Sequence, residues 1–497
     1  MRLPAALAAA VALAAATTAG PTQAGSTATR SDLARSYHRF EQAMLRHPGL
    51  LERDALRLNA EFDRASLAFF GGTFASSCRI LDGLTASIDE AAGDPVRRWL
   101  LSLRARDLPA ALLLTGGEAP AAGSTAALEV VVAPLYPLDL KLPIDLVASL
   151  RLVAPATTND PSDLPLAVDA DGVGRASVAH ALLGDRLGTW RVEVEARGHE
   201  PLEVARFAAV RRPLAQQRAA IEATLKRAAA STPALVQALA TVRARLALLD
   251  DEPSPNSSAQ FLVDPLELLR DVAAEASAIG RGEDPYSRRP GDLWRVLVLG
   301  RHEVPMRIFA PARLCAPDAA PAPLVVVLHG AGGDENMFMD GYGAGAIRHL
   351  AEERGFLVAS PQTTALAAHP RNLDTLVDSI SLEYAVDRRR IYVLGHSMGA
   401  GAAAFFAGAR VELLAAVCCI AGGSPAGAER IAPTLVIVAE RDHLVPAERL
   451  LSGLEPAIAA GLDLTVERVP DFGHTLVVTH RLAHAVDWLL GHARDGG

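Results

Sequence analysis

The stretch RIYVLGHSMGAGA, residues 390–402, sets one serine between two glycines directly after an apolar run. Its centre matches the pattern G-x-S-x-G around Ser397, after a predicted strand and before a predicted helix of small residues. Such a turn holds the serine in strained backbone geometry, and side chains at the two glycines would collide with the neighbouring strand or helix. The stretch therefore predicts a strand–turn–helix unit that presents Ser397 as a candidate nucleophile.

The sequence around this turn, from about Asp292 to Gly497, alternates short apolar runs with helical segments. The candidate strands are an opening hairpin, LWRVLVLG and VPMRIFAP, followed by LVVVLHG, FLVASPQ, RIYVLG, LLAAVCCIAGG, TLVIVAERD and LDLTVERVP. Short strands separated by helices are typical of a parallel sheet with both faces covered. We therefore predict an α/β fold with a doubly wound, mostly parallel sheet, whose ligands bind at the carboxyl ends of the strands.

Two loops after these predicted strands supply the base and the orienting carboxylate that a nucleophilic serine needs. Asp442 follows the run TLVIVAER, and His474 lies between the last predicted strand and the C-terminal helix. The chain order Ser, Asp, His is that of the α/β-hydrolases. Glu440 is the competing acid, but it lies nearer the strand. We predict a triad of Ser397, His474 and Asp442.

A tetrahedral oxyanion needs two backbone donors, one of them the N–H after the nucleophile, here that of Met398. The loop LHGAGGDENMF supplies the other donor, for which we choose Ala331, with Gly330 as the alternative. Gly330 and Gly332 let the backbone approach the substrate. We assign to His329 and His396 a role in shaping the site rather than in proton transfer.

Other features of this block could suggest a metal or a cofactor. His480 and His484 have the i, i+4 spacing of half a metal site, but no third ligand accompanies them. DGYGAGAIRHL follows no predicted strand and lacks the full dinucleotide-binding pattern. We therefore predict neither a metal nor a cofactor.

The front of the chain differs in character from this block. It begins with Arg2, an alanine-rich apolar segment and then small residues, the layout of a cleaved signal peptide. Helical periodicity follows, then short alternating segments such as TWRVEVEARG, then helical periodicity again. We predict five parts: a signal peptide (1–24), a helical region (25–115), a small β-sandwich (124–212), a helical linker region (213–288) and an α/β-hydrolase catalytic domain (289–497).

Composition excludes some classes of partner. The formal charge of −9 comes with no long basic block, which argues against nucleic acid. After the first residues no apolar run is long enough to span a bilayer. We therefore predict a secreted or periplasmic protein. Four scattered cysteines do not form a disulfide framework, although a bridge between Cys78 and Cys315 stays open.

PLVVVLHGAGGDENMF, YAVDRRRIYVLGHSMGAG and RDHLVP together resemble the α/β-hydrolase esterases related to feruloyl esterases, polyhydroxybutyrate depolymerases and predicted secreted peptidases of prolyl-oligopeptidase type. The resemblance covers about residues 290–497 and implies the same triad and the same oxyanion donors. Residues before about 285 carry no family pattern. Only SPAGAERIAP separates two predicted strands where many relatives insert a cap, so the site is either open or covered by the N-terminal regions.

These observations predict an exported serine hydrolase that cleaves carboxylic esters. The resemblance implies substrates such as acylated polysaccharide or polyester fragments. Two alternatives stay open: a serine peptidase of prolyl-oligopeptidase type, and a catalytically idle hydrolase-like binding protein. We expect the front of the chain to restrict or position the substrate, and the alternative is an independent spacer.

Overall fold

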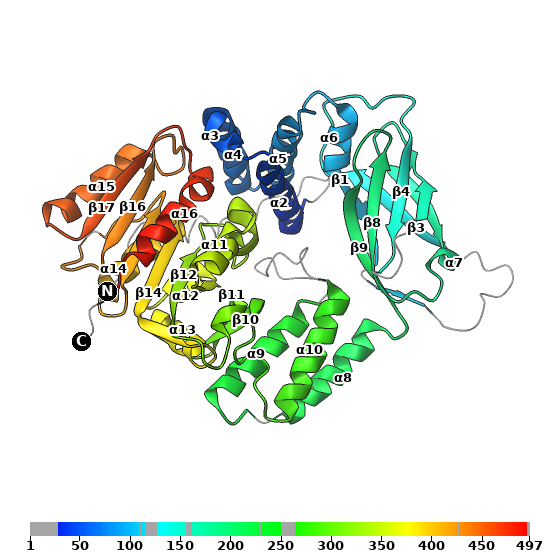
Figure 1. Cartoon of the computed structure of the whole chain (residues 1–497). Coiled ribbons are helices and arrows are strands. Elements are labelled where there is room, and N and C mark those ends of the chain that lie inside the picture. The colour runs from blue at the N-terminus through cyan, green and yellow to red at the C-terminus, as the bar shows by residue number, and fades with distance from the viewer. Residues whose placement is uncertain are drawn as a thin grey trace.

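The computed structural model describes residues 28–109, 111–114, 127–155, 162–228, 230–249, 264–425 and 427–494. The predicted signal peptide, residues 1–24, lies outside the described residues. Figure 1 shows the large C-terminal sheet on one side of the molecule and a smaller β-sandwich on the other. Two groups of helices, one from the N-terminus and one from the middle of the chain, lie between them.

The large sheet contains eight strands in the order β10-β11-β13-β12-β14-β15-β16-β17. Their bounds are β10 (Gly291–Leu299), β11 (His302–Ala310), β12 (Ala322–Leu328), β13 (Leu357–Pro361), β14 (Val386–His396), β15 (Ala416–Ile420), β16 (Thr434–Ala439) and β17 (Leu464–Val469). β11 pairs antiparallel with both of its neighbours, and all pairs from β13 to β17 are parallel. With the turn at Ser397, this order defines the α/β-hydrolase fold and confirms the predicted fold class.

The helices of this part cover both faces of the sheet. They are η2 (Ala312–Leu314), η3 (Met337–Gly341), η4 (Tyr342–Ala344), α11 (Ala346–Arg354), α12 (Thr363–Ala367), α13 (Asn372–Ser381), α14 (Met398–Ala409), α15 (Ala447–Ala459) and α16 (Leu476–Leu490). In β12, Val325 and Val327 face one hydrophobic core while Leu324 and Val326 face the other. Neighbouring strand residues point to opposite faces, which is why this strand is apolar throughout.

The N-terminal helices are part of the core of this fold. They are α2 (Arg30–Arg46), α3 (Leu50–Arg53), α4 (Ala55–Phe70), α5 (Phe74–Ile88) and α6 (Pro95–Ser102). Phe40 of α2 and Leu58 and Phe62 of α4 are buried in the same hydrophobic cluster as Val325 and Val327 of the sheet. These helices therefore complete one face of the sheet instead of forming a separate domain.

The β-sandwich has two sheets, with strand orders β1-β3-β7-β6 and β2-β9-β8-β4-β5. The strands are β1 (Leu103–Arg106), β2 (Ala111–Leu113), β3 (Ala127–Pro134), β4 (Ala148–Val153), β5 (Ser162–Pro165), β6 (Ala167–Val168), β7 (Gly174–Ala179), β8 (Gly188–Ala196) and β9 (Leu202–Val210), with a short helix α7 (His180–Leu183). β1 and β2 come from residues that the sequence pattern assigned to the helical region, so the predicted boundary at 115 is too late. Both are very short, and they join sheets formed mostly by later residues.

Three helices, α8 (Leu214–Arg227), α9 (Pro233–Ala247) and α10 (Pro265–Gly280), form a small bundle with its own core. α9 also covers β10, the edge strand of the large sheet. The N–H groups of Val296 and Val298 donate to Thr241 Oγ1 at 3.2 Å and to Gln237 Oε1 at 3.1 Å. Because an uncovered sheet edge can pair with another chain, these contacts protect it. The region predicted as a helical linker is therefore a packed part of the structure.

A buried ion pair at the edge of the large sheet contacts Tyr286, a core residue of this bundle. The Arg295 guanidinium of β10 donates two hydrogen bonds of 2.5 Å to the Glu383 carboxylate, and neither side chain is exposed by more than 2%. The same guanidinium stacks on the Tyr286 ring at 3.7 Å from its centroid. Such a pair is costly to break, because removing one partner leaves a buried charge uncompensated.

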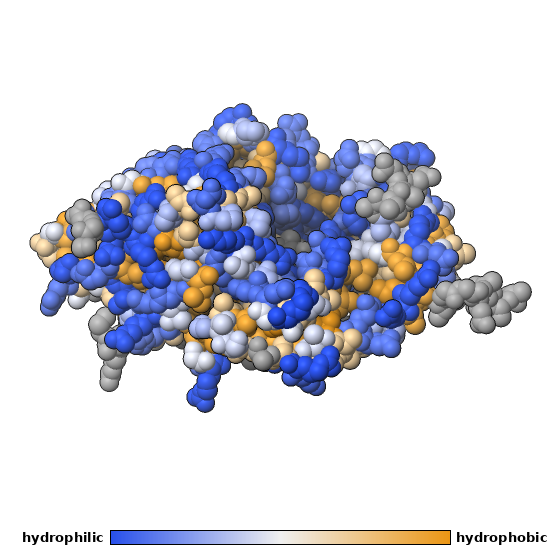
Figure 2. Space-filling model, turned by 60° about the horizontal axis from the view of Figure 1, so that its bottom comes forward, coloured by the Kyte–Doolittle hydropathy of each residue, from blue (hydrophilic) through white to orange (hydrophobic). Residues whose placement is uncertain are grey.

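No helix in the described part of the chain is long and apolar enough to cross a membrane. Figure 2 shows one face of the molecule as largely hydrophilic, with hydrophobic residues in separate patches. The four cysteines are buried and free, so the bridge left open between Cys78 and Cys315 does not form in this structure.

Candidate active site

Ser397 lies at a strained turn between β14 and α14. Its backbone angles are φ 55° and ψ −117°, a region that residues other than glycine rarely adopt. The two flanking glycines are required by contact between backbones. A Cβ on Gly395 would lie 2.1 Å from the Gly399 carbonyl oxygen, and one on Gly399 would lie 2.0 Å from the Leu328 carbonyl oxygen. The two glycines thus allow the strand and the helix to pack closely around an unusual serine conformation.

Asp442 and His474 form a buried pair in the loops after β16 and β17. His474 Nδ1 donates to Asp442 Oδ2 at 2.7 Å, and the two side chains are 5% and 1% exposed. The other oxygen of Asp442 accepts from the N–H groups of Leu444 and Val445, at 2.8 and 2.7 Å. These donors hold the carboxylate in place, and a proton on Nδ1 leaves His474 Nε2 free to act as a base.

Glu440, the competing acid in the sequence, points elsewhere. Its carboxylate pairs with Arg468 at 2.7 Å, and a third of the side chain is exposed. Of the two candidate acids, the structure brings Asp442 and not Glu440 to His474.

Ser397 and His474 line the same cavity. The Ser397 hydroxyl makes no hydrogen bond to His474 in the described part of the chain. Contacts between a nucleophile and its base are often long in the absence of substrate and shorten when substrate binds. Ser397 and the oriented His474 ring therefore share one cavity.

His396 connects the serine turn to the loop that carries His474. Tyr342 Oη donates to His396 Nδ1 at 2.7 Å, and His396 Nε2 donates to the His474 carbonyl oxygen at 3.0 Å. Complete burial, with the nearby His474 as a smaller cause, lowers the pKa of His396 well below its usual range. Both ring nitrogens of His396 are thus engaged, and the ring holds the backbone of the His474 loop.

His329 has a similar role at the start of the glycine-rich loop. Its Nδ1 donates to the Gly330 carbonyl oxygen at 2.8 Å, while its Nε2 accepts from the Thr363 N–H at 3.1 Å. Burial lowers the pKa of His329 as well. The ring therefore holds the loop against the adjacent strand end.

The two predicted oxyanion donors are the backbone N–H groups of Ala331 and Met398. Ala331 lines the cavity, and the Met398 N–H is the first of α14, so it has no partner within the helix. Gly330, the alternative to Ala331, lines the same cavity, so both residues stay candidates for the second donor.

Gly332 makes room for a side chain of the N-terminal helices. A Cβ at this position would lie 2.1 Å from the Phe69 ring, which α4 places on the loop. From α2, Arg30 donates to the Gly332 carbonyl oxygen at 3.2 Å and pairs with Asp334 at 3.0 Å. The N-terminal helices thus hold the glycine-rich loop from outside.

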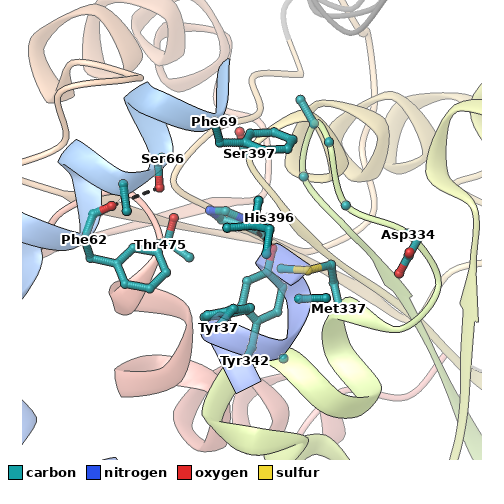
Figure 3. Close-up of a pocket in the computed structure, with 18 of the residues that line it drawn as sticks. Tyr37, Phe62, Ser66, Phe69, Asp334, Met337, Tyr342, His396, Ser397 and Thr475 are labelled. Atoms are coloured by element: carbon teal, nitrogen blue, oxygen red, sulfur yellow. Dashed lines mark hydrogen bonds between the residues drawn. The ribbon is translucent and has the colours of Figure 1, made fainter. Parts of the chain in front are cut away.

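The cavity has a volume of about 170 Å³ and is mostly apolar, and Figure 3 shows Phe69 beside Ser397 and Phe62 on the same helix. Its lining includes Leu33, Ala34, Tyr37, His38, Phe62, Ala65, Ser66, Phe69, Phe70 and Leu81 from the N-terminal helices. Sequence reasoning did not find these residues. Helical periodicity shows which face of a helix is apolar, but not which surface that face covers.

Between β15 and β16 the described residues form no helix or strand, so the site has no cap at that place. The N-terminal helices cover it instead, which decides between the two predicted alternatives. The two histidines with the i, i+4 spacing of half a metal site each pair with a different carboxylate. His480 pairs with Glu52 at 3.1 Å, and His484 pairs with Glu467 at 2.9 Å.

The site and the sheet order define an α/β-hydrolase fold with a serine nucleophile turn. Solved structures with a similar fold include S-formylglutathione hydrolase FrmB of Staphylococcus aureus, at 15% identity over 41% of this chain and 98% of that one, with a TM-score of 0.35. They also include a thermostable esterase, at 16% identity over 74% and 95% of the two chains, with a TM-score of 0.35. A third is the feruloyl esterase module of Clostridium thermocellum in complex with sinapinate, at 13% identity over 43% and 94%, with a TM-score of 0.34.

No family model and no curated protein matches the chain. At these identities the similarity concerns the fold and carries no activity over to this chain.

Proposed function

We propose that this protein is a serine hydrolase that cleaves carboxylic esters. Ser397 is the nucleophile, His474 the base and Asp442 the residue that orients the base. The observation that carries this proposal is the hydrogen bond of 2.7 Å between Asp442 and His474, whose ring lines the same cavity as the strained Ser397. A domain that only binds ligands does not require a histidine oriented in this way.

The reaction follows from the roles of these atoms. Ser397 Oγ attacks the ester carbonyl carbon while His474 Nε2 takes the hydroxyl proton, and the carbonyl oxygen becomes an oxyanion that faces the N–H groups of Ala331 and Met398. The bond to the alcohol oxygen then breaks, and the alcohol leaves with the proton from His474. Water attacks the acyl-enzyme, His474 takes one of its protons, and Ser397 leaves with that proton as the carboxylic acid is released.

Esters fit this site better than peptides. An alkoxide is a better leaving group than an amine, so amide cleavage needs tight anchoring of the chain on both sides of the bond. The cavity is small and mostly apolar, which suits an acyl group. Together with the predicted signal peptide, it points to acyl esters met outside the cytoplasm, such as acylated polysaccharide or polyester fragments.

The proposal predicts that kcat/KM for acetyl, butyryl and feruloyl esters exceeds that for matched peptide amides. The measurement is a direct comparison of these substrates with one preparation of enzyme. Ser397→Ala protein serves as the control for background hydrolysis. A preference for any amide over all esters would show that the peptidase alternative is right.

We also expect Phe69 to limit the length of the acyl group. Phe69→Ala should raise the ratio of kcat/KM for octanoyl over acetyl esters by about tenfold, since each buried methylene contributes ~0.8 kcal/mol. Leu67→Ala is the matched control, because Leu67 lies on the same helix with half of its side chain exposed. An equal change of the ratio in both variants would argue against an acyl site at Phe69.

A further inference from the structure

Helix α4 contacts the backbone of the loop that carries His474. The Gly473 N–H donates to Asn59 Oδ1 at 2.8 Å, and the His474 N–H donates to Asp63 Oδ1 at 3.3 Å. Asn59 and Asp63 are each 2% exposed and lie four residues apart, so they share one face of the helix. Two consecutive backbone donors at the proposed base are thus held by a helix more than four hundred residues earlier in the chain.

The carbonyl oxygen of His474 accepts a third hydrogen bond, from His396 Nε2 at 3.0 Å. The loop is therefore held both by its N–H groups and by a carbonyl group. The close approach also explains Gly473: a Cβ there would lie 2.6 Å from Asp63 Oδ2. The glycine before the histidine lets a carboxylate reach the loop.

Burial of the Asp63 carboxylate at this position is energetically unfavourable. Its second oxygen, Oδ2, has no hydrogen-bond partner in the described part of the chain. Burial raises the pKa of Asp63 to about 6; nearby Asp442 adds to the increase, while His474 and His443 act against it. A buried, half-satisfied acid usually costs stability, so its presence calls for a reason in function.

We propose that Asn59 and Asp63 are positioning residues for the catalytic base: α4 fixes the backbone of His474, and the Asp63 carboxylate adds a second negative charge beside the Asp442–His474 pair. This inference rests on the proposed Ser-His-Asp reaction. His474 becomes an imidazolium in the transition state, and a nearby negative charge stabilises that form. Asp442 orients the ring, and Asp63 acts through the loop and through its charge.

The charge has two measurable consequences. Ionised Asp63 favours protonated His474, so Asp63→Asn should lower kcat by about tenfold with little change in KM. The same variant should move the acid limb of the kcat/KM profile down by roughly half a pH unit or more.

The second consequence concerns stability. An acid whose pKa is raised in the folded state stabilises the fold below its unfolded pKa of 3.8, and that contribution is lost as the pH rises through about 6. Asp63→Asn should therefore raise Tm at pH 8 but not at pH 4.

The test compares pH–rate profiles and Tm values of the full-length wild type, Asp63→Asn and Glu61→Gln. Glu61 lies on α4, has 36% of its side chain exposed and pairs with Arg64, so Glu61→Gln removes a charge from the same helix away from the site. Lower kcat, a shifted acid limb and a higher Tm at pH 8 in Asp63→Asn alone would support the inference. A profile that superimposes on that of the wild type, or the same shift in Glu61→Gln, would overturn the role of the charge.

Asn59→Ala tests the positioning role separately from the charge. This test remains available if Asp63→Asn does not fold. It removes the acceptor of the Gly473 N–H without a change of charge, so kcat should fall while the acid limb keeps its place. An unchanged kcat would overturn the positioning role. A failure of the proposed function is distinguishable, because Ser397→Ala would then retain activity whatever Asp63→Asn does.

Discussion

Ser397→Ala should lower kcat for an ester by roughly 10⁴-fold or more, and His474→Ala should do the same, because members of a triad act as a unit. The double variant should therefore lose little more than either single variant. Folding should be preserved in Ser397→Ala, because the change removes a single hydroxyl from a side chain that makes no hydrogen bond to His474. The measurements are kcat for the three variants and their thermal unfolding.

A fluorophosphonate probe gives an independent readout, since only an activated serine should react with it. The wild type should label and Ser397→Ala should not. Failure of the folded wild type to label would rule out the serine hydrolase and leave the binding protein.

The same assay distinguishes the two candidate acids. Asp442→Asn should lose nearly as much activity as Ser397→Ala, since His474 then loses the partner that sets its tautomer. Glu440→Gln should keep activity, because its carboxylate pairs with Arg468 on the exposed side. The reverse result would show that the assignment of the acid is wrong.

A chain that begins at residue 285 should fail to accumulate as a folded, soluble enzyme. The front of the chain is not a spacer: α2, α4 and α5 share one hydrophobic core with the large sheet, and α9 covers the edge strand β10. Removing them would expose a large apolar face and an unpaired sheet edge, both of which favour aggregation. Soluble yield and cooperative thermal unfolding are the measurements.

Two leucines of α4 test the same point in the full chain. Leu58 is fully buried in the shared core, whereas Leu56 is 55% exposed. Leu58→Ala should lower the free energy of unfolding by about 2–5 kcal/mol, and Leu56→Ala by less than about 0.5 kcal/mol. A folded and fully active chain from residue 285, or a Leu58→Ala variant as stable as Leu56→Ala, would contradict a shared core.

The α/β-hydrolase fold was predictable because its signals are local. The strands are continuous apolar runs, since both faces of the sheet are covered, and the turn at Ser397 needs glycines on both sides of the serine. The positions of Asp442 and His474 followed from one topological rule, that the loops after parallel strands meet at the same edge of the sheet. Each of these inferences uses residues within one strand, one turn or one loop.

Boundaries and covering surfaces were less predictable. β1 and β2 have four and three residues, so periodicity has too few positions to separate them from the end of a helical region. The helices α8, α9 and α10 carried an apolar face, but nothing in their own sequence indicated that α9 would supply Thr241 and Gln237 to the edge of the large sheet.

By itself, the sequence determined the α/β-hydrolase fold of the C-terminal part, the candidate serine and the two residues proposed to activate it, because these depend on patterns within short segments. Only the tertiary structure decided what lies over the site. The contacts of Phe69 with Gly332, and of Asn59 and Asp63 with the His474 loop, join residues between about 260 and 415 positions apart. Such contacts depend on how whole helices pack on a completed sheet, and local pattern carries no information about that packing.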